Sequence, residues 1–205
     1  MSTQKEIKVM IGLPTMSYIH TYLAITIMSW LTDAKVGLRL YPTLNVTPVD
    51  EARNCIVEEF MNGEAKDCTH LLFIDADTIP PQDALYKLLS HDKDIVSGLT
   101  PIIDYHDKDG TFYRKWNCSD MNERLVKPNT GLVPIKGAGG SCLLIKREVF
   151  EKLEKPYFRF LYKDDNNKPI IVSEDIYFIT KAFGAGFQVY ADTSVICKHH
   201  KSIVW

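Results

Sequence analysis

Two carboxylates stand one residue apart directly after an apolar run, in the segment Asp75-Ala76-Asp77. Alternation along an extended chain points both side chains to the same side, with the small Ala76 between them. Two carboxylates that face one point repel each other unless a cation lies between them. Their oxygen atoms favour magnesium or manganese, which commonly bridge protein carboxylates to a substrate diphosphate. Two aspartates can also merely end a strand and cap a turn, so both interpretations stay open.

A second acidic pair, Glu174-Asp175, follows Ser173 at the start of a predicted helix. Asp175 has the chemistry of a general base, which takes a proton from an acceptor hydroxyl. A structural role explains the pair equally well, because serine caps helices and acidic side chains in the first turn suit the helix dipole. Helical spacing predicts a buried face made of Ile176, Ile179 and Phe183.

Basic side chains offer partners for these carboxylates. The segment Cys197-Lys198-His199-His200 closes the last predicted strand, and one of its histidines could complete a metal site with Asp77. Imidazole and carboxylate together suit manganese, and we favour His199 over His200 for this role. Arg53 lies one turn into a predicted helix, where its fork of donors could reach a diphosphate. A surface ion pair is the alternative for Arg53.

A glycine-rich segment, Gly137-Ala138-Gly139-Gly140, stands before a predicted strand. A dinucleotide-binding fingerprint needs a helix at that point, so this segment is not such a fingerprint. Gly139 and Gly140 allow the backbone to approach a ligand closely. A tight loop without a ligand is the alternative.

The elements that must position these residues alternate between strands and helices. Apolar runs predict strands at residues 7–13, 36–41, 70–74, 95–99, 142–145, 187–190 and 194–197. Apolar periodicity predicts helices at residues 18–31, 147–153 and 173–183, and further helices after Thr47 and after Pro80-Pro81. Thr47 is the expected cap of its helix, with Pro48 at the first helical position and Asp50 three residues after the cap.

This order of elements predicts an α/β fold with one open sheet flanked by helices. Continuous apolar strands such as residues 70–74 are buried on both faces, as in parallel sheets, so we expect a mixed but mainly parallel sheet. Ligands of such sheets bind outside the carboxyl ends of the strands, which is where Asp75 and Asp77 stand. Residues 100–140 are richer in Asp, Lys, Gly, Asn and Pro, and predict loops and short antiparallel strands that vary with substrate.

Composition narrows the classes of protein that fit. The chain has 205 residues, 45% of them hydrophobic and 24% charged, which suits one folded domain. A net charge of −2 provides no basic stripe for a nucleic acid, so we do not expect that partner. No apolar run approaches the ~20 residues of a membrane span, and residues 1–6 lack a secretory signal. Five cysteines without a Cys-x-x-Cys pair indicate reduced, mostly buried thiols and a cytoplasmic protein.

Taken together, the motifs resemble a known family. They are, in chain order, Gly12-Leu13-Pro14-Thr15, Ala52-Arg53-Asn54, Leu72-Phe73-Ile74-Asp75-Ala76-Asp77, Gly139-Gly140-Ser141-Cys142-Leu143-Leu144-Ile145, Ser173-Glu174-Asp175 and Cys197-Lys198-His199. Their order and spacing, over nearly the whole chain, resemble the GT-A fold glycosyltransferases, especially compact family-two-like members of bacteria and of viruses or phages. For a viral member the expected location is the host cytoplasm.

The resemblance implies a function and a role for each motif. It implies a metal-dependent transfer of sugar from a nucleoside diphosphate sugar, a UDP-sugar, to the hydroxyl of a glycan or another acceptor. Pro14 and Thr15 would line the base pocket and Arg53 would help to hold the nucleotide. Asp75 would lie near the ribose or the metal, and Asp77 and His199 would bind Mn²⁺ or Mg²⁺.

The resemblance also divides the chain and its chemistry into two halves. Asp175 would be the base of an inverting transfer, with Glu174 in support. Residues 1–100 would form a Rossmann-like nucleotide-sugar half, with Gly139 and Gly140 as further donor-binding residues, and residues 101–205 the acceptor half. A hydroxylated base in modified DNA stays open as an acceptor.

Other functions fit part of the pattern. A phosphohydrolase of the haloacid dehalogenase type also places Asp-x-Asp after an apolar strand, here Asp75 and Asp77. That motif normally stands near the start of its fold, whereas about seventy residues precede it here. A nucleotidyltransferase shares the sheet and the metal but fits the late acidic pair and the terminal histidine less well. A nucleotide-sugar-binding module without catalysis is the non-enzymatic alternative.

Overall fold

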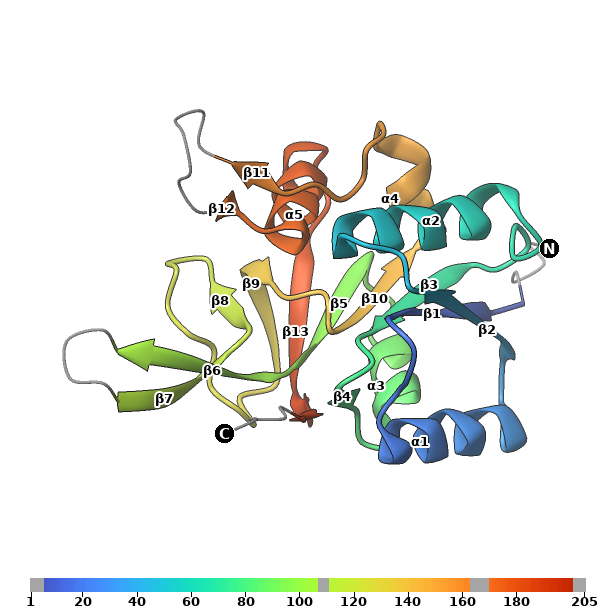
Figure 1. Ribbon diagram of the computed structural model, residues 1–205. Coiled ribbons are helices and arrows are strands. Elements are labelled where there is room, and N and C mark those ends of the chain that lie inside the picture. Colours follow the sequence, from blue (N-terminus) through green and yellow to red (C-terminus); the bar gives the residue numbers. More distant parts are fainter. Residues whose placement is uncertain (1–5, 107–110, 163–169, 201–205) are drawn as a thin grey trace.

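A central sheet organises the chain, whose computed structural model describes residues 6–106, 111–162 and 170–200. The strands of this sheet are β1 (Lys8–Thr15), β2 (Gly37–Leu44), β3 (His70–Ile74), β5 (Ile95–Leu99), β8 (Cys118–Asp120), β9 (Leu132–Ala138), β10 (Cys142–Lys146) and β13 (Val189–Ile196). They follow the spatial order β2-β1-β3-β10-β5-β13-β9-β8. The predicted α/β class with an open mixed sheet is confirmed (Figure 1).

Helices cover both faces of this sheet (Figure 1). They are α1 (Thr21–Thr32), α2 (Val49–Asn62), α3 (Ala84–Ser90), α4 (Arg147–Lys152) and α5 (Glu174–Gly184). Alternation along β3 sends Leu71 and Phe73 to the face under α2, α4 and α5, and sends Leu72 and Ile74 to the face under α1 and α3. Each face therefore has its own apolar core, and β3 is buried on both sides as its uninterrupted apolar run predicted.

The strand directions agree with the sequence-based expectation. β1 pairs in parallel with β2 and β3, and β5 pairs in parallel with β13. β10 is antiparallel to β3 and β5, and β9 is antiparallel to β13 and β8. Six of the eight strands therefore run in one direction and only β9 and β10 are reversed, so the predicted mixed, mainly parallel sheet is confirmed. Because β10 runs against β3, its first residue pairs with the last residue of β3, which brings the glycine-rich segment beside Asp75.

Three short two-stranded sheets extend the fold. They pair β4 (Thr78–Ile79) with β14 (Lys198–His199), β6 (Pro101–His106) with β7 (Thr111–Trp116), and β11 (Leu161–Tyr162) with β12 (Ile170–Val172). The hairpin of β6 and β7, together with β8 and β9, fills the region for which loops and short antiparallel strands were predicted. Strands β4 and β14 have two residues each and were not predicted as elements.

Two helices, α2 and α5, correct sequence-based expectations. Helix α2 begins at Val49 with Pro48 as its cap residue and no side-chain cap bond, so the predicted cap at Thr47 is wrong. Asp50 accepts a hydrogen bond from the Phe160 amide instead, at 3.2 Å. On α5, the predicted buried face is only partly correct, because Ile179 is buried while Ile176 and Phe183 are each 37% exposed. Phe178 and Ala182 occupy the buried positions instead.

Two further expectations concern the strands predicted near residues 187–197 and the cysteines. One bent strand, β13, replaces the two strands predicted near residues 187–197, and its register shifts between Asp192 and Ile196. All five cysteines are free, and only Cys55 is exposed, so the prediction of mostly buried thiols is confirmed. Among the described residues, no helix is both long enough and apolar enough to cross a membrane.

Candidate active site

A cavity of about 490 Å³ opens where β1 and β3 end. This volume lies in the range of about 300–1,000 Å³ that is usual for small-molecule sites. Its wall is built from the end of β1, the residues before and at the start of α1, the first residue of α2, the turn after β3 and His200, which follows β14. The lining residues are Pro14, Thr15, Met16, Tyr18, Ile19, His20, Thr21, Val49, Asp75, Ala76, Asp77 and His200. The structure thus brings four predicted donor-site residues to one cavity: Pro14, Thr15, Asp75 and Asp77.

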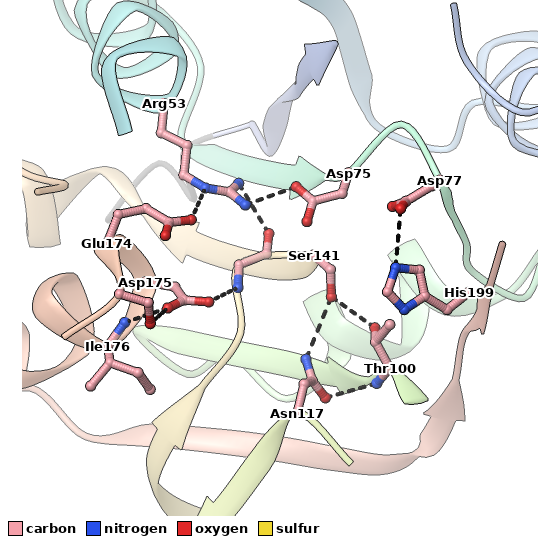
Figure 2. Close-up of polar contacts among 12 residues, drawn as sticks. Arg53, Asp75, Asp77, Thr100, Asn117, Ser141, Glu174, Asp175, Ile176 and His199 are labelled. Carbon is pink, nitrogen blue, oxygen red and sulfur yellow. Dashed lines mark hydrogen bonds and ion pairs between the residues drawn. The ribbon is translucent and has the colours of Figure 1, made fainter. Parts of the chain in front are cut away.

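The turn after β3 holds its two aspartates in different directions. The Asp75 amide donates to the Ser141 carbonyl at 3.1 Å, and the Ala76 carbonyl accepts from the His20 amide at 3.0 Å. These bonds tie the turn to β10 on one side and to the start of α1 on the other. Figure 2 shows Asp75 directed toward Arg53 and Asp77 directed toward His199. We expected both carboxylates to face the same point. They line the same cavity but point toward different partners.

The two-residue pairing of β4 with β14 delivers His199 to Asp77 across 122 positions of sequence. The His200 amide donates to the Asp77 carbonyl at 2.8 Å, which fixes the register of the pairing. His199 Nε2 then lies 3.1 Å from Asp77 Oδ2, and His199 Nδ1 lies 2.7 Å from the Pro101 carbonyl oxygen. The predicted choice of His199 over His200 as the partner of Asp77 agrees with this geometry, while His200 lines the cavity and lies against the His20 ring.

The Asp77–His199 pair offers two ligand atoms that suit a metal ion, one carboxylate oxygen and one imidazole nitrogen. A carbonyl oxygen only accepts, so Nδ1 carries the ring proton and, in a neutral imidazole, Nε2 presents a lone pair to the Asp77 carboxylate. Two such acceptors face each other stably only with a cation between them, either a proton or a metal ion. Their 3.1 Å separation matches neighbouring corners of an octahedron with metal–ligand distances of about 2.1 Å. The residues present therefore fit Mg²⁺ or Mn²⁺.

Asp75 does not join Asp77 and His199 to form a three-residue metal site. In the part of the chain that the structure describes, no cluster of three or more His, Cys, Asp and Glu side chains is arranged to hold a metal. One oxygen of Asp75 is 2.8 Å from Arg53 Nη2, in an ion pair. Two protein ligands are a common share for an ion that also binds substrate phosphates, since magnesium retains several non-protein ligands.

Arg53 occupies a different position from the predicted one. Its side chain is only 2% exposed and does not line the cavity. Its donors meet three acceptors: Asp75 Oδ1 at 2.8 Å, Glu174 Oε1 at 3.2 Å and the Gly140 carbonyl at 3.3 Å. Burial lowers the pKa of Arg53, but the nearby carboxylates outweigh this effect and the net shift is upward, so the guanidinium is firmly charged. The expected contact with a diphosphate and the alternative of a surface ion pair are both inconsistent with this burial.

The acidic pair Glu174-Asp175 begins α5, and its two members face different surroundings. Glu174 is 6% exposed, and its pKa is raised by burial and by the charge of Asp175, with Arg53 acting in the opposite direction. Asp175 is half-buried and accepts from the Gly140 amide at 3.2 Å, the Ile176 amide at 2.7 Å and the Ser173 hydroxyl. Ser173 is the cap residue but makes no cap bond through its side chain, because its hydroxyl binds Asp175.

The two glycines before β10 are required by protein contacts. A Cβ on Gly140 would lie 2.8 Å from Arg53 Cζ and Nη2, which is closer than real Cβ contacts. A Cβ on Gly139 would lie 3.2 Å from Asn117 and 3.5 Å from Asp175 Oδ2. Close approach of protein side chains thus explains both glycines, and the approach to a ligand that the sequence suggested stays a prediction.

Sequence reasoning missed a polar network between the two acidic centres (Figure 2). The Ser141 hydroxyl donates to Thr100 Oγ1 at 2.9 Å, and Asn117 accepts from the Thr100 amide at 2.8 Å. Asn117 Nδ2 lies 3.5 Å from Ser141 Oγ. These residues come from three segments that are distant in sequence, and single Ser, Thr and Asn residues carry no motif. The one usable signal in the sequence was that Ser141 stands directly before a predicted strand, next to the glycine-rich segment.

Known proteins match this chain through structure and not through sequence. No protein family and no curated protein sequence matches it. Protein A197 from STIV superposes with a TM-score of 0.62 at 19% identity, over 96% of this chain and 87% of that one. GalNAc-T7, solved with UDP, GalNAc and Mn²⁺, matches with a TM-score of 0.56 at 12% identity, over 98% of this chain and 45% of that one. The catalytic domain of Drosophila β1,4-galactosyltransferase 7, in complex with xylobiose, matches with a TM-score of 0.54 at 16% identity, over 96% and 72%.

At such low sequence identities, these structural similarities establish the fold alone. The GT-A glycosyltransferase fold that the motifs predicted is confirmed, and the chain spans less than half the length of the GalNAc-T7 chain.

Proposed function

We propose that this chain is a metal-dependent glycosyltransferase that moves a sugar from a nucleoside diphosphate sugar, specifically a UDP-sugar, to an acceptor hydroxyl. The observation that carries the proposal is the pairing of Asp77 with His199 at 3.1 Å at the edge of a cavity that suits a nucleotide. The GT-A fold supports it, as does a fold neighbour whose structure holds UDP, GalNAc and Mn²⁺.

The donor occupies the cavity at the ends of β1 and β3. Pro14 and Thr15 line the base pocket, and Asp75 lies near the ribose. Asp77 and His199 would hold Mn²⁺ or Mg²⁺, which supplies the positive charge that stabilises the departing diphosphate. The remaining ligands would be phosphate and water oxygens. Ala76 and Asp77 keep their positions through the backbone bonds to His20 and His200.

Asp175 acts as the general base of an inverting transfer. Its carboxylate accepts three hydrogen bonds, from Gly140, Ile176 and the Ser173 hydroxyl, out of about four lone-pair positions. One position thus stays available for the hydroxyl of an acceptor. As the acceptor oxygen bonds to the anomeric carbon, that carbon's bond to the diphosphate oxygen breaks, and the hydroxyl proton passes to Asp175. Glu174 supports this base from the protein side through the buried Arg53.

The two halves of the chain divide the work in this proposal. Residues 1–100 supply the donor cavity apart from His200, and residues 101–205 supply His199 and His200, the base and the surface that receives the acceptor. The acceptor is a glycan by default, with a hydroxylated base of modified DNA as the second candidate. Release of UDP in the presence of water alone already reports on the donor half, because water can replace the acceptor hydroxyl.

The test compares UDP release by the wild type and by Asp175→Asn, with UDP-galactose and UDP-N-acetylgalactosamine in Mn²⁺. We expect Asp175→Asn to bind UDP as the wild type does and to release it about 10³-fold more slowly, the usual share of a general base. Asp83→Asn, on an exposed carboxylate paired with Lys87, is the control and should leave the rate unchanged.

The possible outcomes separate the candidate functions. Equal rates for Asp175→Asn and the wild type would refute the role of Asp175 as the general base. Binding of UDP-sugars without turnover, over a wide panel of acceptors, would identify a binding module. Hydrolysis of nitrophenyl phosphate would instead favour the phosphohydrolase.

A further inference from the structure

Arg53 is a buried cation that joins both sides of the candidate site without facing its cavity. Its three acceptors belong to segments 22, 87 and 121 residues away in sequence: the turn after β3, the link before β10 and the start of α5. A charge this deeply buried needs partners, and here each of the three guanidinium nitrogens donates to a carboxylate or a carbonyl. The ring centroids of Phe73 and Phe158 lie 5.3 and 6.0 Å from the guanidinium carbon, and the Arg53 side chain is only 2% exposed.

The peptide groups of Gly140 connect Arg53 to the proposed base. The Gly140 carbonyl accepts from Arg53 Nη1 at 3.3 Å, while the Gly140 amide donates to Asp175 Oδ2 at 3.2 Å. The residue is thus held from both sides, and its missing side chain is what allows the guanidinium to approach. A displacement of Arg53 therefore moves the donor that orients the Asp175 carboxylate.

Electrostatics make the same connection. Asp75, Glu174 and Asp175 all raise the pKa of Arg53, so its charge is balanced by carboxylates from both halves of the site. Glu174 also makes an ion pair with Arg53 Nε at 3.2 Å. Removal of the cation would leave these three acidic groups without their shared countercharge, and neighbouring like charges repel each other or take up a proton.

We infer that Arg53 is a positioning residue that aligns the donor-site carboxylate Asp75 with the base Asp175 and does not touch the donor. The inference rests on the proposed function and deepens it. It assigns to Arg53 the coupling of donor side and acceptor side, in place of the nucleotide contact that the sequence suggested. The catalytic effect must then pass through Asp175, and nucleotide affinity must be largely independent of Arg53.

The experiment measures UDP release from UDP-galactose and UDP-N-acetylgalactosamine, together with UDP affinity, for Arg53→Lys and for a matched control. The control is Arg39→Lys, on an arginine that is 47% exposed and pairs with Asp67 at 3.2 Å. Lysine keeps the charge but loses the fork that reaches three acceptors at once. We expect Arg53→Lys to lower kcat about 100-fold and to change the Kd for UDP by less than about threefold. Arg39→Lys should change neither.

A double-mutant cycle with Asp175→Asn shows whether the effect passes through the base. If Arg53 acts by positioning Asp175, Arg53→Lys should cost less than about threefold in the Asp175→Asn background, because the aligned group is already absent. Gly140→Ala disturbs the same contact from the opposite side and should lower kcat with the same pattern, which covers the case in which Arg53→Lys fails to fold.

Each outcome decides between the two proposals. An active wild type, with a UDP affinity that falls about 100-fold in Arg53→Lys, would show that Arg53 binds the donor and would overturn this inference alone. Multiplicative effects of Arg53→Lys and Asp175→Asn would overturn it as well. A wild type that turns over no nucleotide sugar would overturn the proposed function, and with it the positioning role.

Discussion

Gly140→Ala is the substitution whose cost the structure defines most closely. The new Cβ would lie 2.8 Å from Arg53 Cζ and Nη2 and 3.1 Å from Nη1. The guanidinium cannot yield easily, since it is 2% exposed and bonded to Asp75, Glu174 and Gly140 itself. Overpacking of a buried site costs about 1–3 kcal/mol, and a neighbour fixed on three sides places this substitution near about 3 kcal/mol.

Two other glycines calibrate this value. At Gly139 the new Cβ would meet Asn117 at 3.2 Å, a less severe contact than the one at Gly140, so we expect a smaller loss of about 1 kcal/mol. At Gly184, in the last turn of α5, nothing lies within 4 Å of a new Cβ, and alanine should stabilise the fold by about 0.4–1 kcal/mol. The three substitutions thus form a graded series on one residue type.

Urea unfolding followed by circular dichroism measures the series. We expect the free energy of unfolding to rank Gly184→Ala above wild type, wild type above Gly139→Ala, and Gly139→Ala above Gly140→Ala. In thermal unfolding, a loss of about 3 kcal/mol lowers the Tm of a chain of this size by roughly 6 to 12 °C. Equal midpoints for Gly140→Ala and Gly184→Ala would refute the tight contact between Gly140 and Arg53.

Two further predictions concern groups outside the candidate site. Burial raises the pKa of Asp192, but hydrogen bonds from His91 and Ser194 outweigh it and the net pKa is lowered, so Asp192→Asn should destabilise the fold at pH 7 by about 1–3 kcal/mol. A lowered pKa gives stability that is lost in acid, so this difference in urea unfolding should shrink below about pH 4, and a constant difference would contradict it. Burial raises the pKa of Cys118 to about 12, and only Cys55 is exposed, so a thiol reagent at pH 8 should label one cysteine quickly in the folded chain and all five in urea. Rapid labelling of two or more cysteines in the folded chain would contradict this burial.

The positions of the buried strands in the sheet were predictable from the sequence. The apolar run at residues 70–74 matches β3, because a strand that is covered on both faces is usually apolar throughout. The strand predicted at residues 95–99 matches β5, which is also fully buried although it contains Ser97 and Gly98. The direction of β10 was not predictable, since an apolar strand of five residues reads the same in either orientation. The two-residue strands β4 and β14 are below the length at which any periodicity exists.

The candidate site was predictable to the extent that its residues stand in motifs. Asp77 and His199 were predicted as partners and lie 3.1 Å apart. Arg53 was misplaced, because an arginine beside an apolar helix face looks the same in sequence whether it points to a ligand or into the protein. Its burial depends on Glu174, which is 121 residues away, and on a glycine at position 140. Only the folded chain brings these groups together.

The central claim is that Asp77 and His199 hold a divalent cation that binds the diphosphate of a sugar nucleotide. The most direct measurement is the Tm of the wild type and of Asp77→Asn with UDP-galactose and UDP-N-acetylgalactosamine, each with and without Mn²⁺. At a ligand concentration of about 100 times Kd, binding stabilises by about 2.7 kcal/mol, which raises the Tm by roughly 5 to 11 °C. We expect this rise for the wild type in Mn²⁺ only, and its loss in Asp77→Asn. A rise of the same size without the metal, or in Asp77→Asn, would contradict it.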